Sequence, residues 1–177
     1  MPTSPQTVLN FWFNELTAKQ HFIKDTALDD TICTRFGDTL AAAAQCELFT
    51  WRATAEGRLA EIIVLDQFSR NIHRDTPRAF AQDALAQELV ASGQDRSLLG
   101  AQRVFAYMPY MHSESALVHT QAVALFTQLG IQDNLNFELR HKAIIDRFGR
   151  YPHRNAILVR SFSMQELAFL NEPGSSF

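Results

Sequence analysis

The chain lacks the features that mark several large classes of protein. Its 177 residues include only two cysteines, and no apolar run approaches the roughly 20 residues that a membrane-spanning helix needs. The N-terminal stretch "MPTSPQTVLNFWFNE" has no basic segment, so we expect no signal peptide. Phosphate-binding loops, dinucleotide fingerprints and zinc-ligand spacings are also missing, which predicts a protein without a cofactor or a bound metal.

Net charge and cysteine spacing narrow the expected setting and partners. A net charge of −3 gives no global field that would attract nucleic acid or an anionic membrane. Positive charge is concentrated in residues 140–160, where six Lys and Arg accompany one acid, Asp146. Cys33 and Cys46 are expected to share a helix and to lie about 20 Å apart, too far for a disulfide. These features favour a reduced, cytoplasmic setting without nucleic-acid or membrane partners.

Helical periodicity and capping residues dominate the chain. Ile32, Phe36 and Leu40, for example, recur at helical spacing. Residues typical of helix N-termini precede the expected helices: Ser4, Asp29 or Asp30, Thr54, Thr76, Ser113 or Ser115, Asp133 and Ser163. The expected helix ends are at Gly93, Pro109, Gly130 and Gly149. No alternating strand pattern is present, so we predict a single all-α domain over residues 1–177, with seven or eight helices in antiparallel pairs.

A nine-residue string is written twice. The stretch "DQFSRNIHR" (Asp66–Arg74) returns in the second half of the chain as "DRFGRYPHR" (Asp146–Arg154). Asp, Phe, Arg, His and Arg match in register. Each copy therefore offers two arginines and a histidine near an expected helix end.

In each copy an aspartate precedes an arginine by four residues: Asp66 precedes Arg70, and Asp146 precedes Arg150. On a helix such residues share one face, and an exposed pair contributes about 0.3–0.5 kcal/mol. We therefore expect Asp66 and Asp146 to orient their arginines rather than to take part in chemistry. If the two copies meet, their arginines would form a cationic wall suited to an anion.

The stretch "YMPYMHSES" (residues 107–115) is expected to supply a third wall, because Pro109 would break its helix and leave His112 and Glu114 between helices. The predicted function is the binding of a small anionic ligand or an acidic peptide end in a polar groove. The predicted lining residues are Arg70, Asn71, Arg74, His112, Glu114, Arg150, His153, Arg154 and Asn155.

Two other functions fit the same residues. In a hydrolase-type enzyme, His112 or His153 would be the acid–base group and Glu114 its partner, while the arginines would hold the substrate's anion. In a structural scaffold, the strings would lock helix ends together and bind nothing. Glu138 and His141 have the Glu-x-x-His spacing of di-iron bundles, but a second copy of that motif is missing.

An ordered set of motifs resembles a known bacterial family. The motifs "FWF", "LDQFSRN", "TPRAFAQD", "MPYMHSE" and "RFGRYPHRN" and the tail "EPGSSF" are similar to those of DUF924, a family of uncharacterised function. The resemblance covers nearly the whole chain and implies a TPR-like stack of antiparallel helix pairs. The family positions carried over are Asp66, Gln67, Phe68, Arg70, Asn71, Arg78, Asp83, His112, Ser113, Glu114, Arg150, Pro152, His153, Arg154 and Asn155.

The chain departs from the family pattern in places. Ser69 stands where the pattern has Pro, and Val159 where it has Gly. The segment after Glu114 reads "SALVH" and is less acidic than the pattern. The family supplies no established activity, so the prediction of function depends on the residues themselves.

Overall fold

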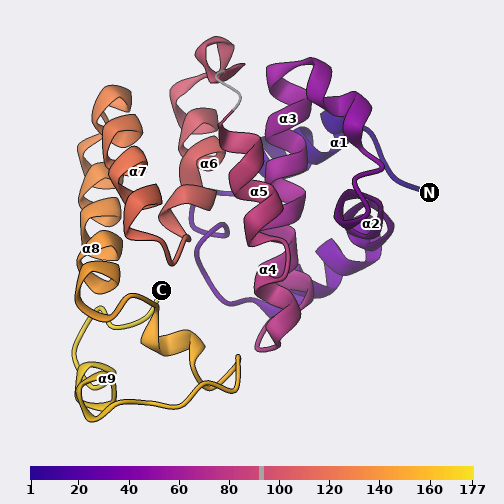
Figure 1. Cartoon of the computed structure of the whole chain (residues 1–177). Coiled ribbons are helices and arrows are strands. Elements are labelled where there is room, and N and C mark those ends of the chain that lie inside the picture. Colours follow the sequence, from indigo (N-terminus) through magenta and orange to yellow (C-terminus); the bar gives the residue numbers. More distant parts are fainter. Residues whose placement is uncertain (92–93) are drawn as a thin grey trace. The chain divides into compact units, whose positions relative to one another are not determined.

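The structure, a computed structural model, describes residues 1–91 and 94–177 and is built from helices (Figure 1). No strand occurs among these residues, so the predicted all-α class is confirmed. The α-helices are α1 (Pro5–Asn10), α2 (Thr26–Ala44), α3 (Ala55–Ile62), α4 (Ser69–Ile72), α5 (Asp83–Val90), α6 (Gly100–Met111), α7 (Ala116–Leu129), α8 (Gln132–Phe148) and α9 (Met164–Phe169). None of the helices described is long and apolar enough to cross a membrane.

Shorter helical segments accompany the α-helices. Two are π-helical, η1 (Phe11–Glu15) and η3 (Ile63–Phe68). The others are 3₁₀ turns: η2 (Phe49–Ala53), η4 (Pro77–Phe80), η5 (Gln94–Ser97) and η6 (Pro152–Arg154).

The chain divides into two compact units. Unit 1 consists of residues 1–74 and 78–109, and unit 2 of residues 75–77 and 110–177. The boundary at Pro109 falls inside α6. The sequence pattern, which predicts one domain, carries no linker or change of composition that marks this division.

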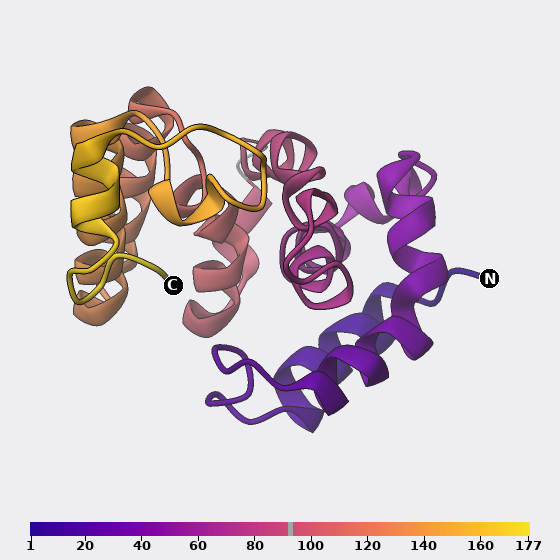
Figure 2. The same cartoon turned by 90° about the horizontal axis from the view of Figure 1, so that it is seen from below.

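Unit 1 is built around a continuous helical run from α3 through η3 to α4 (Figure 1). Every residue from Leu59 to Ser69 is buried, as expected for a helix that is covered on all sides. The rings of Phe11, Phe36 and Phe68 pack together, with centroids 4.7–6.1 Å apart. Residues 16–25 form the loop that connects η1 to α2 (Figure 2). This core fixes α2 against η3 and α4, which carry the first repeated string.

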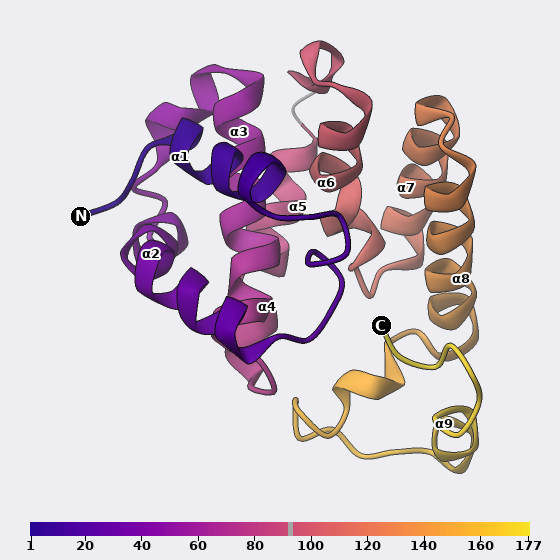
Figure 3. The same ribbon diagram turned by 180° about the vertical axis from the view of Figure 1, so that it is seen from behind.

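Unit 2 contains an antiparallel hairpin of α7 and α8, which lie side by side in Figures 1 and 3. Their connection is short because Gly130 ends α7 in the left-handed region, with a φ of 75°. Ile145, Tyr151 and Phe169 belong to one buried cluster that joins α8 to α9. The second repeated string lies at the C-terminal end of α8 and is therefore placed by this cluster.

Side-chain caps begin several helices as predicted. The confirmed N-caps, each accepting a backbone N–H of the first turn, are Ser4, Thr54, Ser115 and Ser163. Ser163 and Glu166 form the complete capping box. Gly149 ends α8 with a φ of 69°, and Gly130 ends α7 in the same way.

The predicted start of α2 is wrong. The helix begins at Thr26, one turn earlier than a cap at Asp29 or Asp30 would allow. Asp25 is the cap, because its Oδ1 accepts the N–H groups of Ala27 and Leu28 at 3.0 and 3.2 Å. Asp29 consequently lies inside the helix, where its carboxylate is available to other elements.

Two predictions based on proline also differ from the structure. Pro109 does not end α6, which continues to Met111, because a proline near the last turn removes only one helical hydrogen bond. Thr76 and Pro77 precede a 3₁₀ turn rather than a long α-helix, and α5 begins only at Asp83.

Three further boundary predictions have different outcomes. Asp133 lies in the first turn of α8 rather than capping it, since Ile131 is the N-cap. Gly93 lies outside the described residues. Cys33 lies in α2, but Cys46 follows the end of that helix, and both are exposed free thiols.

Candidate functional site

Arg70, in the first repeated string, is held by two carboxylates of unit 1. Its Nη1 lies 3.0 Å from Oδ1 of Asp66, the pair expected from the four-residue spacing. Its Nη2 lies 3.1 Å from Oδ1 of Asp83. Asp66 is fully buried, so this pair fixes the arginine against the core. The positive charge of Arg70 is thus balanced within the protein.

Asn71 and Arg74 both bind Asp29 of α2. Arg74 donates from Nε to Oδ2 and from Nη2 to Oδ1 of Asp29, at 2.6 and 2.7 Å. Asn71 donates to the same Oδ1 at 2.7 Å. Burial alone would raise the pKa of Asp29, but the hydrogen bonds from Arg74 and Asn71 outweigh it and lower the pKa. The first string therefore ties α4 to α2.

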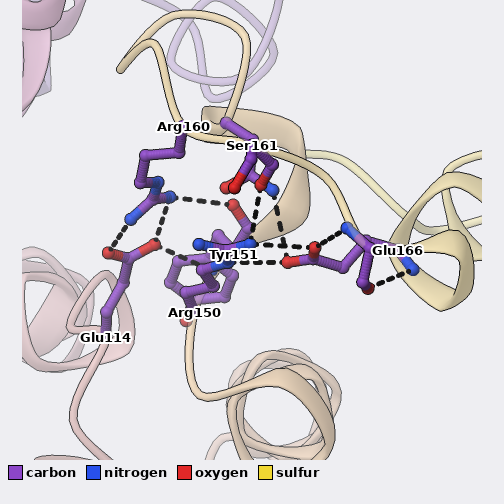
Figure 4. Close-up of polar contacts among 8 residues, drawn as sticks. Glu114, Arg150, Tyr151, Arg160, Ser161 and Glu166 are labelled. Atoms are coloured by element: carbon purple, nitrogen blue, oxygen red, sulfur yellow. Dashed lines mark hydrogen bonds and ion pairs between the residues drawn. The ribbon is translucent and has the colours of Figure 1, made fainter.

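Arg150, in the second string, binds Glu166 and not Asp146 (Figure 4). It donates from Nε and Nη2 to the two oxygens of Glu166 at 2.6 and 2.9 Å, and from Nη2 to the carbonyl of Ser161 at 2.8 Å. Asp146 instead accepts from Lys142 at 2.6 Å. The predicted orienting role of Asp146 is therefore wrong, because α9 presents a carboxylate in bidentate geometry. The pair with Arg150 holds the pKa of Glu166 well below its ordinary value.

Glu114 is bound on both oxygens by Arg160, at 2.8 and 2.9 Å, and it also accepts the N–H of Tyr151 at 2.7 Å (Figure 4). Burial would raise the pKa of Glu114, yet these hydrogen bonds lower it. A carboxylate that stays ionised and paired is a poor proton-transfer partner. The hydrolase-type alternative, which gave Glu114 that role, therefore finds no support in this arrangement.

The remaining predicted residues of the second string serve unit 2 in different ways. Arg154 donates to the carbonyl of His112 at 3.0 Å, and Asn155 donates to Glu166 at 3.2 Å. Burial, assisted by the charge of Arg154, lowers the pKa of His153 to about 4. His153 is consequently neutral at neutral pH.

A buried proton-sharing pair joins α7 to α8. His119 and Glu138 are both fully buried, with Nδ1 of the histidine 2.7 Å from Oε1 of the glutamate. Nε2 of His119 faces the carbonyl of Ser113 at 2.8 Å and must therefore donate. One proton consequently lies between Nδ1 and the carboxyl group, and burial raises the pKa of Glu138. The sequence pattern paired Glu138 with His141 and did not indicate His119 as its partner. Within residues 1–91 and 94–177, the structure contains no group of three or more His, Cys, Asp or Glu side chains that could hold a metal ion.

A pocket in unit 1 lies between α2 and α4, and we call it the α2–α4 pocket. Its volume, open mouth included, is about 570 Å³. Gly37, Leu40, Ala41 and Ala44 line one side. Their spacing places them on one face of α2. This side of the pocket is therefore apolar and shallow.

The first repeated string contributes part of the other side. Ser69, Ile72 and His73 line the pocket from the end of the α3–α4 run. Ser69 is fully buried, and its Oγ has no hydrogen-bond partner in the described part of the chain. Burial, and then the charge of Arg78, lowers the pKa of His73, which keeps its imidazole neutral at neutral pH.

The segment after α4 completes the pocket with Arg78, Ala81 and Gln82. The Arg78 side chain is exposed. In the ranges that the structure describes, its guanidinium has no carboxylate or carbonyl partner, unlike that of Arg74. The sequence indicated Arg78 only as a position of the family pattern, because Arg78 lies four residues after the end of the first repeated string.

A family model described as a bacterial protein of unknown function, DUF924, matches residues 8–174. The chain belongs to the DUF924 family. A solved structure of a protein of unknown function from Agrobacterium tumefaciens is also similar, with 36% sequence identity and a TM-score of 0.89. The likeness covers 94% of this chain and 96% of that chain. A search of curated proteins found no match.

Two departures from the DUF924 pattern have structural consequences. Ser69, where the pattern has Pro, is a lining residue of the α2–α4 pocket whose hydroxyl is buried in the wall. Val159, where the pattern has Gly, adopts a φ of 53°. That left-handed conformation is unfavourable for a β-branched residue and is natural for glycine. Val159 in this DUF924 member therefore keeps a backbone conformation that glycine would adopt more readily.

Proposed function

We propose that this DUF924 protein binds a small anionic ligand in the α2–α4 pocket. The observation that carries the proposal is the Arg78 guanidinium, which borders the pocket without a partner in the described part of the chain. Arg70 and Arg74, by contrast, are balanced by carboxylates. A guanidinium beside a concave surface favours an anion, since charge-assisted hydrogen bonds are roughly twice as strong as neutral ones.

Neutral polar groups of the pocket support the same function. A buried hydroxyl without a partner costs about 1–3 kcal/mol, and Ser69 Oγ is in that position. Because this Oγ is closed to solvent, an oxygen of a bound anion would accept its proton only after a neighbouring side chain of the pocket wall moved. The neutral imidazole of His73 offers one donor and one acceptor. Arg78 would therefore supply the charge, and the neutral His73 would add no competing charge.

The proposal keeps the ligand class predicted from the sequence and changes the residues. None of the nine predicted lining residues borders the α2–α4 pocket. The pocket instead contains His73, the histidine of the first string, together with Arg78. The two arginines of the first string, Arg70 and Arg74, do not line the pocket. Their ion pairs with Asp29, Asp66 and Asp83 hold its wall in place.

The test compares wild type, Arg78→Ala and Arg96→Ala in thermal unfolding with acetate and with phosphate. Arg96 is a matched control, since it is exposed in the same unit and does not line the pocket. At an anion concentration ten times Kd, binding contributes about 1.4 kcal/mol, or roughly 3–6 °C for a chain of this size. We expect this shift in wild type and Arg96→Ala and its loss in Arg78→Ala.

Anions also stabilise proteins without binding to a site, and that effect would be shared by all three proteins. The difference between Arg78→Ala and Arg96→Ala therefore isolates the pocket. Equal shifts in the two variants would refute the proposal.

A further inference from the structure

We infer that the ligand of the α2–α4 pocket is a small monocarboxylate with a slender apolar body that lies along α2 at Gly37. The inference rests on the proposed function, which supplies the anionic group, and adds the chemical class of the rest of the ligand. Three observations lead to it: an unexplained glycine, an apolar wall and the charge of the lining residues.

Gly37 lies in the interior of α2, a helix of 19 residues. Glycine in that position destabilises a helix relative to alanine, because it loses more backbone freedom on folding. Its φ is not in the left-handed region, so backbone conformation does not require glycine. A Cβ atom built at Gly37 would meet nothing within 4 Å, so packing within the described chain does not require it either.

Gly57, in the same unit, is a glycine that packing does require, and it contrasts with Gly37. A Cβ atom at Gly57 would lie 2.0 Å from the carbonyl oxygen of Trp51, which excludes any side chain. Gly37 has no such neighbour, and it borders the α2–α4 pocket. The space that its missing side chain leaves is therefore open to a ligand.

The wall that Gly37 begins is apolar and elongated. Leu40, Ala41 and Ala44 continue it along α2, and the seven-residue span corresponds to roughly 10 Å of helix. Ile72 adds an apolar contact from the other side. Phosphate or sulfate has no surface that could use this wall, whereas an aliphatic or aromatic body would bury apolar area against it.

The charge of the pocket favours a single negative charge. Arg78 is the lining residue with a permanent charge among the ten that border the pocket. His73 is neutral, and Ser69 and Gln82 are uncharged polar groups. A monocarboxylate is balanced by one guanidinium in bidentate geometry, while a phosphate dianion would leave one charge uncompensated.

Isothermal titration calorimetry on the full chain tests the inference with acetate, butyrate, hexanoate and phosphate. Each buried methylene corresponds to roughly a three- to fourfold gain in affinity. We therefore expect affinity to rise from acetate to hexanoate and phosphate to bind no better than acetate. Arg78→Ala should weaken all three carboxylates, because it removes the group that holds the carboxylate end.

Gly37→Leu should fill the space along α2. We expect hexanoate to bind about tenfold more weakly to this variant, the equivalent of about two buried methylenes, and acetate to change less than about twofold. Thr34→Leu is the matched control, since it adds the same side chain to an exposed position of α2 outside the pocket. If Gly37→Leu fails to fold, Ala41→Leu on the same wall replaces it.

The outcomes separate this inference from the proposed function. If Arg78→Ala abolishes binding but acetate, butyrate and hexanoate bind equally and Gly37→Leu alters none, the apolar body is refuted and the anion site stands. Tighter binding of phosphate than of hexanoate would refute the monocarboxylate class. If no carboxylate and no phosphate binds, or Arg78→Ala binds like wild type, the proposed function itself fails.

Discussion

Replacing Val159 with glycine is expected to stabilise the protein. Val159 has a φ of 53°, and its side chain is 90% exposed, so it makes no packing contact that the substitution would remove. The left-handed conformation costs a residue with a Cβ atom roughly 1–2 kcal/mol. Glycine avoids that cost but loses about 0.5–1 kcal/mol more in backbone entropy. The net gain for Val159→Gly is therefore roughly 0.5–1 kcal/mol.

The surrounding turn prevents the backbone at Val159 from relaxing to a more favourable conformation. The N–H of Arg160 donates to the carbonyl of Asn155 at 2.8 Å. The Arg160 side chain is in turn paired with Glu114 at 2.8 and 2.9 Å. A change of φ at residue 159 would break both contacts, so the unfavourable conformation persists in the folded protein.

Urea unfolding measures this effect, which should appear as a higher midpoint with an unchanged m value. The melting temperature should rise by roughly 1–4 °C. Val159→Ala keeps the Cβ atom and should gain little, while Val159→Asn should fall between alanine and glycine, because asparagine tolerates the left-handed region. The reasoning is refuted if Val159→Gly is no more stable than Val159→Ala.

Further predictions concern the ion pairs and the buried histidines. Glu166→Gln removes the carboxylate partner of Arg150 and should lower the free energy of unfolding by about 2 kcal/mol. Asp146→Asn should lower it by less than about 0.5 kcal/mol. Comparable losses for the two variants in urea unfolding would contradict the assignment of Glu166 as the partner of Arg150. Burial lowers the pKa of His141 to about 3 and that of His153 to about 4, from an ordinary 6.5. As the pH falls below 6.5, the unfolded chain takes up protons at both histidines and the folded chain does not. The free energy of unfolding should therefore fall between pH 6.5 and 4, and at pH 5 the loss should be about 2 kcal/mol per histidine. His153→Gln should show a smaller loss between pH 7 and pH 5 than wild type, and an equal loss would show that this histidine does not contribute.

Local signals in the sequence were sufficient for much of the fold. Thr54 and Ser163 cap helices because a side-chain oxygen needs only the next turn of its own chain. The start of α2 was missed because Asp25, Asp29 and Asp30 lie within six residues and each is a suitable local cap. Asp29 lies inside α2 and binds Arg74 and Asn71, which are distant in sequence, and no local pattern contains that information.

The candidate site was less accessible to sequence reasoning for the same reason. Asp66 and Arg70 form the expected pair, since both lie on one continuous helical run. The equivalent prediction for Arg150 failed because Glu166, on a later helix, offers two oxygens at once. The role of Gly37 depends on what lies opposite α2, so a glycine inside a helical pattern gave no indication of a pocket.

The position of Pro109 has a consequence for proteolytic cleavage and truncation of the protein. The chain passes from one unit to the other at residues 74–75, 77–78 and 109–110, and the last of these crossings falls inside α6 rather than in a loop. Limited proteolysis, which needs an exposed and extended segment, should therefore find no preferred cut at Pro109. Truncation there would remove the last turn of a helix from one unit and leave an isolated turn on the other, and short helices do not persist alone. A cut at Pro109 is thus expected to destabilise the fragments that it produces, because it divides α6.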